Sequence, residues 1–344
     1  GVIRMAGGHE GSFRGALPLT PAPFLYSLDR AKPVSFDVDL PEGDLAGLAA
    51  ATDLFTDAVG RYGGGLLVTG TIAEPHLYGD FHLAEASFRI SGMEERYFAV
   101  NAKVLLEDTI VTISRLSAKE GKKGTLSCTG RITLRGWKPA LYDLSATANE
   151  FVLASISNIL AIVSGTVNVT TKVEGGRPLP VVSGDFEVKQ SEVYYDLGSL
   201  SPAAGGSTLE PPSWEAAIDL KIPGNTWIRT PDARVELRGD VTLYHDAKGT
   251  YLRGELDLVR GWYNIYNNKF RIRSGQLQFV HAGGMRPIVD IEAETQDPEG
   301  RRIYLTVRWH QDDVEPLLAL THEDPGYSET DIWKMLGGGT VSAP

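Results

Sequence analysis

The chain has very little cysteine: Cys128 is the single one among 344 residues. An internal disulfide framework is therefore excluded, and so is a zinc site built from cysteine side chains. Cys128 stands at an apolar position of an alternating segment, which favours a small buried hydrophobic residue.

Basic residues are also in deficit, with 33 Lys and Arg against 44 Asp and Glu and a formal net charge of −11. The net field repels phosphate backbones and anionic membrane surfaces, so no nucleic acid partner is expected. Long apolar runs are missing too, because serine, asparagine and threonine interrupt the uncharged segment 151–171, and no membrane span is expected. The first residues carry neither a signal pattern nor an initiator methionine, so we interpret the chain as a piece of a longer protein.

Motifs for catalysis or metal binding are scarce. The seven histidines show no metal-ligand spacing. Two groups of histidine and carboxylates, at 310–313 and 322–324, are interpreted as solvated charges in turns. Glu292 and Glu294 share one side of a strand, and a solvent-facing strand side explains them better than a glycosidase pair. No nucleophile elbow or phosphate loop is present. We therefore expect no enzyme, no metal and no cofactor.

What the sequence does contain is strand-like alternation. From residue 66 to about 320, apolar and polar positions alternate with a period of two, as in 125–134 and 233–243. Each such strand has one apolar face and one polar face. The 38 glycines and 19 prolines are typical of the many turns that such strands need.

Helical spacing is confined to two segments, 44–59 and 328–336. The second has a capping box at Ser328 and Asp331 and a stop signal at Gly337. So little helix cannot cover the apolar strand faces. The strands therefore either close on each other as a dry sandwich, or leave an apolar face available to a ligand.

An ordered series of motifs in the C-terminal half is specific. It begins with GELDLVRGWYNIYNNKFRIRSGQLQF at 254–279 and RPIVDIEAET at 286–295, and it continues with an alternating strand around 303–307 and EDPGYSETDIWKMLGGG at 323–339. This series resembles the TamB C-terminal domain family. GTIAEPHLYGDFHL at 70–83 looks like an earlier repeat of the same family.

The resemblance implies an all-β fold: an elongated, curved β-sheet trough, U-shaped and β-helix-like (a "β-taco"), with one or two short helices. Its concave side is expected to be apolar and its convex side polar. We expect three parts: a partial N-terminal repeat at 1–65 with a short helix near 44–59, β-trough repeats at 66–198, and a C-terminal TamB-like β-domain at 214–344 with a terminal helix at 328–336.

The resemblance also implies a function. Similar proteins belong to the translocation and assembly module, a protein secretion system, and to AsmA-like, bridge-type lipid transfer proteins. We expect a periplasmic fragment of an inner-membrane-anchored protein of a diderm bacterium, with the membrane anchor outside this fragment. Its hydrophobic groove would conduct phospholipid, or shield hydrophobic segments, between inner and outer membrane and so support outer-membrane biogenesis. The expected partners are phospholipid acyl chains and an outer-membrane BamA/TamA-like barrel protein. The alternative is a non-conducting scaffold or docking module for such an assembly factor.

Alternation selects the candidate groove residues, although it does not exclude that the same faces form a dry core. The predicted wall residues are Leu126, Ile132, Leu134, Ile218, Leu220, Val235, Leu237, Val241, Leu243, Leu252, Leu256, Leu258, Ile272, Leu277, Phe279, Leu305 and Val307. A second group on the terminal helix, expected to cap the groove or to dock on the barrel partner, comprises Ile332, Trp333 and Leu336.

Overall fold

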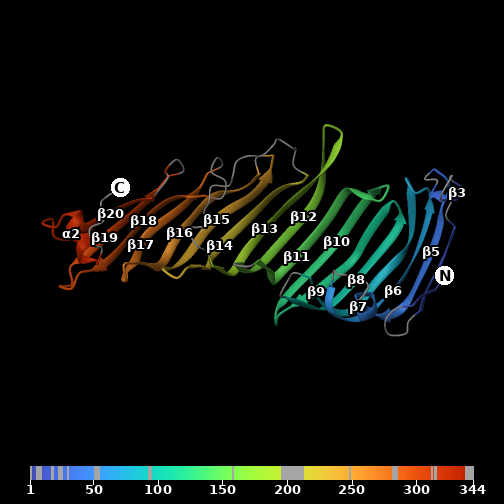
Figure 1. Cartoon of the computed structure of the whole chain (residues 1–344), viewed down its shortest axis with the longest axis horizontal. Coiled ribbons are helices and arrows are strands. Elements are labelled where there is room, and N and C mark those ends of the chain that lie inside the picture. Colours follow the sequence, from blue (N-terminus) through green and yellow to red (C-terminus); the bar gives the residue numbers. More distant parts are fainter. Residues whose placement is uncertain are drawn as a thin grey trace. The chain divides into compact units, whose positions relative to one another are not determined.

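The structure is a computed structural model of the whole chain. It describes residues 2–4, 10–16, 19–21, 26–28, 31–49, 55–91, 95–156, 159–194, 213–247, 249–280, 286–310, 313 and 316–337. Within these ranges nearly all residues lie in antiparallel β-strands, and there are two short helices (Figure 1). The predicted all-β class, with a curved sheet and one or two short helices, is confirmed, and the sheet is open.

The chain divides into two compact units. Unit 1 comprises Gly1–Ser155 with Ser164–Gly184, and unit 2 comprises Ile156–Val163 with Asp185–Pro344. This division does not coincide with the part boundaries expected at residues 65 and 198, which stay predictions.

Unit 1 is a sheet whose strands pair with their neighbours in the sequence from β5 to β10. The elements are β1 (Val2–Arg4), β2 (Glu10–Ala16), β3 (Leu19–Pro21), β4 (Tyr26–Leu28), β5 (Ser35–Asp44), α1 (Leu45–Ala49), β6 (Phe55–Gly70), β7 (Pro75–Ile90), β8 (Arg96–Asp108), β9 (Ile110–Glu120) and β10 (Gly124–Arg135). Residues of β11 (Lys138–Ile156), β12 (Ile159–Glu174) and β13 (Arg177–Tyr194) fall on both sides of the division.

Unit 2 repeats this neighbour-to-neighbour antiparallel pairing from β14 to β20. Its elements are β14 (Glu215–Arg229), β15 (Ala233–Asp246), β16 (Gly249–Ile265), β17 (Asn268–Phe279), β18 (Ile288–Gln296), β19 (Arg302–Trp309), β20 (Leu317–His322) and α2 (Glu329–Met335). The predicted terminal helix and its capping box are confirmed, because the Asp331 amide donates to the Ser328 side chain and the Asp331 carboxylate accepts from the Ser328 amide.

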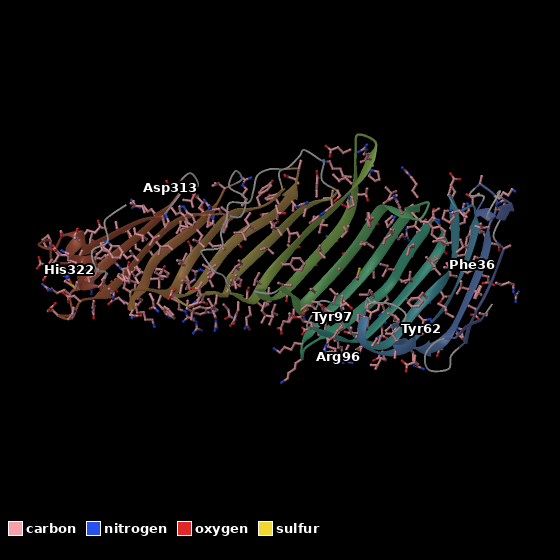
Figure 2. All side chains as sticks on the ribbon, viewed as in Figure 1. Phe36, Tyr62, Arg96, Tyr97, Asp313 and His322 are labelled. Carbon is pink, nitrogen blue, oxygen red and sulfur yellow. The ribbon has the colours of Figure 1, made fainter. Side chains whose placement is uncertain are left out.

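The core of unit 1 gathers around α1. Leu45 of the helix packs with Tyr62 of β6 and Ala86 of β7, and all three are buried (Figure 2). The helix expected over 44–59 is wrong in its second half, because α1 ends at Ala49 and β6 begins at Phe55.

An irregularity in β6 explains the error. The register between β6 and β7 shifts on both sides of Val59, and Asp57 has a φ of +53°. Such bulges insert residues that break the period of two. Phe55 and Val59 therefore fall at a spacing that imitates a helical turn, while Val59 is in fact exposed and Ala58 is buried.

Similar bulges bend the sheets. The register shifts between β7 and β8 near Glu85, and between β8 and β9 near Ala99, and both residues have positive φ. In unit 2 a shift between β14 and β15 coincides with Asn225, whose φ is +57°. A bulge bends its strand and increases the local twist. Bulges on successive strands therefore curve the sheet of each unit.

Candidate functional site

One face of the unit 2 sheet carries apolar side chains from strand to strand. Residues directly opposite each other on antiparallel strands project on the same face. Leu243 of β15 lies opposite both Ile218 of β14 and Leu252 of β16, and Leu256 lies opposite Leu277 of β17. These rows of apolar side chains run across the strands, and we call the surface that they form the apolar face.

The pairing register places every predicted wall residue of unit 2 on the apolar face, namely Ile218, Leu220, Val235, Leu237, Val241, Leu243, Leu252, Leu256, Leu258, Ile272, Leu277, Phe279, Leu305 and Val307. Their role as a groove wall stays a prediction. The sequence reasoning missed Ile222, Val289 and Ile291, which share this face. The alternation of Val289 and Ile291 with acidic neighbours was the signal that could have found two of them.

The apolar face has a buried part and a more accessible part. Leu237, Val241, Leu256, Leu258, Phe279 and Leu305 are buried. The other predicted wall residues of unit 2, among them Ile218, Leu243 and Leu252, are half-buried. In the described part of unit 2, all strands belong to one sheet, so no second sheet covers the half-buried rows. The dry sandwich of two sheets, which the sequence left open, is therefore not the arrangement of unit 2.

Glycines on the apolar face help the sheet to bend around it. Gly239 lies opposite Leu256, and Gly254 lies opposite Val241. Gly239 has a φ of +150°, and a Cβ there would lie 2.2 Å from the Glu255 carbonyl oxygen. Only glycine fits such a close approach of two strands.

In unit 1 the three predicted wall residues Leu126, Ile132 and Leu134 lie on β10 and are half-buried. Ile132 lies opposite Val111 of β9 and Tyr142 of β11, so an apolar row crosses this sheet as well. Cys128 lies on the same face, opposite Leu116 and Ala146. Burial raises the pKa of the Cys128 thiol, as expected for a hydrophobic position.

The opposite face of unit 2 is polar and paired. Thr242 donates a hydrogen bond to Asp219 at 2.7 Å. Burial alone would raise the pKa of Glu236, but a hydrogen bond from the Asn225 amide and the guanidinium of Arg260 hold it below its usual value. We call this surface the polar face. The two faces of one sheet therefore differ sharply in what they can bind.

The terminal helix α2 covers the C-terminal end of the apolar face. Ile332 and Leu336 are buried against a cluster that includes Phe270 and Leu305, and Trp333 is packed at its margin. The side-chain amide of Asn268 donates to the Leu336 carbonyl oxygen at 2.7 Å and fixes the end of the helix. This packing on the chain's own sheet favours a capping role over a docking role for the three predicted helix residues, and both roles stay predictions.

The histidine of the 322–324 group is not a solvated charge, so that prediction is wrong for His322. Its side chain is fully buried with that of Asp297, and Nε2 lies 3.2 Å from Oδ2; Figure 2 labels His322 near the C-terminal end of unit 2. Burial alone would raise the pKa of Asp297, but hydrogen bonds from the Arg301 amide, His322 and the Arg301 guanidinium lower it to about 2. The register of β20 places His322 opposite Ile303, within the core, which the sequence pattern did not reveal.

The other acidic groups are closer to expectation. The His310 side chain is 65% exposed, as predicted, whereas the Asp313 side chain is 43% exposed; Asp312 lies outside the described residues. Glu292 and Glu294 share the polar face. Glu292 is exposed, but Glu294 is largely buried beneath Arg271 and Arg273, so the prediction of a solvent-facing side chain is wrong for Glu294.

Among the described residues, no group of three or more His, Cys, Asp and Glu side chains is arranged to hold a metal ion. Likewise, no described helix has the length and apolar character needed to cross a membrane.

Comparison with known proteins gives one broad match and one distant one. The rice protein SUBSTANDARD STARCH GRAIN 4, chloroplastic (Oryza sativa subsp. japonica) is 24% identical over 316 residues, which is 75% of this chain and 14% of the rice protein. The chain thus spans a small part of that relative, and such a similarity does not transfer a function. The family model of the TamB C-terminal domain matches residues 114–343, well over half of the chain. TamB-family domains are non-catalytic modules of the bacterial envelope with general roles in outer-membrane assembly and lipid transport. This chain belongs to the TamB family.

Proposed function

We propose that this chain is a periplasmic bridge element whose apolar face forms a groove that conducts phospholipid, or shields hydrophobic segments, between the inner and outer membranes. The observation that carries the proposal is the set of half-buried apolar rows in unit 2, such as Ile218, Leu243 and Leu252, over which no second sheet lies in the described residues. The acyl chains of a bound phospholipid would lie on these rows, and its polar headgroup would stay in water.

The energetic argument rests on the cost of exposing acyl chains to water. Burying one methylene gains about 0.8 kcal/mol, so a chain of about 16 methylenes loses roughly 13 kcal/mol when it is moved into water. An uninterrupted apolar surface removes most of that barrier. Half-buried apolar residues such as Ile218, Leu220 and Leu243 lie on neighbouring rows, so a lipid could shift from one row to the next without leaving the apolar face.

A second candidate function is a non-conducting scaffold that docks on a BamA/TamA-like outer-membrane assembly factor. The observation in its favour is that Leu317 and Leu318 are exposed on β20, the last strand of unit 2. Part of this strand is already covered, because the Leu320 amide donates to the Glu329 side chain of α2 at 3.1 Å. A scaffold would need its surface residues but not an accessible apolar face.

Site-specific photo-crosslinking in cells separates the two functions. A photoreactive amino acid at Leu243 or Leu252 is on the apolar face and half-buried, and it should capture phospholipid. The matched controls are Thr242 and Arg253, which are the next residues on the same two strands and project on the polar face. Lipid captured equally at all four positions, or at none, refutes the groove.

A charge on the apolar face gives a second test. Leu243→Asp places a carboxylate in a half-buried row, where water can still reach it. We expect the melting temperature to change little and lipid capture at Leu252 to fall. Loss of folding would instead indicate that this row forms a dry core, and would favour the scaffold.

A further inference from the structure

The polar face of unit 2 carries a concentration of cations and indole rings that the net charge of −11 conceals. One row of directly opposed residues runs Arg229, Arg234, Trp262, Arg271 across four strands. The next row contains Trp227, Glu236 and Arg260. We call the six residues that dominate this area the basic aromatic patch: Trp227, Arg234, Arg260, Trp262, Lys269 and Arg271.

The cations of the patch are held over the rings. The guanidinium of Arg234 lies 4.6 Å from the centre of the Trp227 ring and that of Arg260 lies 5.4 Å from it. The ammonium of Lys269 lies 4.6 Å from the Trp262 ring. Cation–π contact of this kind orients a cation without neutralising it.

Carboxylates neutralise only part of the patch. Glu236 pairs with Arg260, and Glu294 pairs with Arg271. In the part of the chain that the structure describes, no carboxylate lies within ion-pair distance of Arg234 or Lys269. The patch therefore keeps a net positive charge. At physiological ionic strength the Debye length is about 8 Å, so an approaching anion responds to this local charge more than to distant acidic residues.

Aromatic side chains at the adjoining turn point to a lipid surface as the anion. The turn between β16 and β17 follows the strand residue Ile265 and precedes Lys269, and its Tyr266 is 54% exposed. Tyr266 also makes an edge contact with Trp333 of α2, with ring centres 6.2 Å apart. Tyrosine and tryptophan next to lysine and arginine are typical of protein surfaces at the boundary between water and a bilayer.

We propose that the basic aromatic patch and the β16–β17 turn dock unit 2 on the phosphate headgroups of an anionic phospholipid bilayer. The inference rests on the proposed function in one respect: the surface would hold the apolar face beside the membrane that supplies or receives lipid. Arg234 and Lys269 contact headgroup phosphates, and Tyr266 inserts its ring at the interface.

Vesicle co-sedimentation of the purified chain tests the proposal. The vesicles contain phosphatidylcholine alone or phosphatidylcholine with phosphatidylglycerol. We expect binding only to the anionic vesicles and weaker binding as salt is raised. A Lys or Arg near an anionic membrane contributes about fivefold to affinity, so Arg234→Gln with Lys269→Gln should weaken binding roughly 25-fold.

The matched control removes two exposed cations from unit 1, through Arg131→Gln with Lys138→Gln, and gives the same net charge. If the two double variants lose vesicle binding equally, the proposal is overturned. Equal binding of the unmodified chain to both kinds of vesicle also overturns it. Binding to heparin or polyglutamate without binding to anionic vesicles also overturns the lipid assignment. Unaltered circular dichroism melting shows that each variant is folded.

Failure of this proposal and failure of the groove have different signatures. If the groove exists, lipid capture at Leu243 persists in the Arg234→Gln, Lys269→Gln variant when detergent-dispersed phospholipid is supplied, because those residues lie on the other face. Absence of capture at Leu243 in every form of the chain would remove the groove alone, since vesicle binding is measured independently of it.

Discussion

Replacing Gly64 of β6 by alanine tests whether the close approach of neighbouring strands requires glycine at this position. Gly64 has a φ of +150°, and a Cβ built on it would lie 2.2 Å from the Asp80 carbonyl oxygen and 2.9 Å from the Phe81 Cα. Both atoms belong to the backbone of β7, so no side chain can rotate away. The two strands would have to separate, or the Gly64 backbone would have to change region.

The magnitude follows from two costs. A non-glycine residue in a sparsely populated φ region costs about 1–3 kcal/mol. Overpacking an added carbon against fixed neighbours costs about 1–3 kcal/mol more. In a chain portion of this size each kcal/mol lowers the melting temperature by about 2–4 °C. Gly64→Ala should therefore lower the melting temperature of unit 1 by at least about 4 °C.

Gly65 is the matched control, because it is the next residue of the same strand and projects on the other face. It has no positive φ, and a Cβ on it would lie no closer than 3.5 Å to its nearest neighbour, the Val38 carbonyl oxygen. Gly65→Ala should be neutral, or stabilise by about 0.4–1 kcal/mol through the unfolded chain. Scanning calorimetry of the two variants decides the matter. If Gly64→Ala melts within about 2 °C of Gly65→Ala, against an expected difference of at least about 4 °C, the close-approach argument is refuted.

Three further predictions concern the C-terminal end of unit 2. The folded-state pKa of Asp297 is lowered to about 2. Its carboxylate therefore stabilises the fold fully above the unfolded-state pKa near 4, and this stabilisation is lost as the pH falls towards 2. In Asp297→Asn the melting temperature should no longer show this dependence on pH. Ser328→Ala removes half of the capping box and should cost about 1 kcal/mol, seen as faster amide hydrogen exchange in α2 with little change in β14–β16. Ile332→Ala should lower the free energy of unfolding by about 2–5 kcal/mol, measured by calorimetry, because Ile332 is 1% exposed. Lys334→Ala is the control at an exposed position of the same helix, and an equal effect there would contradict the packing argument.

Alternation predicted the faces of the strands well, because the pairing of antiparallel strands preserves it. Leu243 and Leu252 were assigned to one face from sequence alone, and the register puts them directly opposite each other. Alternation failed where strands bulge. Val59 was placed on a helix because the bulge around Asp57 and Gly60 shifts the apolar positions out of the period of two.

The sequence did not reveal how deeply each apolar side chain is buried. Leu237 and Leu243 are separated by six positions of one alternating strand, yet Leu237 is buried and Leu243 is half-buried. The difference depends on the curvature of the sheet, which glycines and bulges on neighbouring strands determine together. His322 shows the same limit. Its burial depends on Asp297 and Arg301, which come from the turn before β19 and approach it only in the folded sheet.

The placement of polar and aromatic residues follows from how an open sheet must be stabilised. A sheet covered by one short helix cannot bury both faces, so its stability depends on close packing along the apolar face and on paired charges along the polar face. Glu236 and Glu294 fit that requirement, since each accepts from arginine on the next strand. Arg234 and Lys269 do not, because they rest on indole rings without a carboxylate among the described residues. Their charges therefore stay available to the anionic surface that we propose as the partner of the basic aromatic patch.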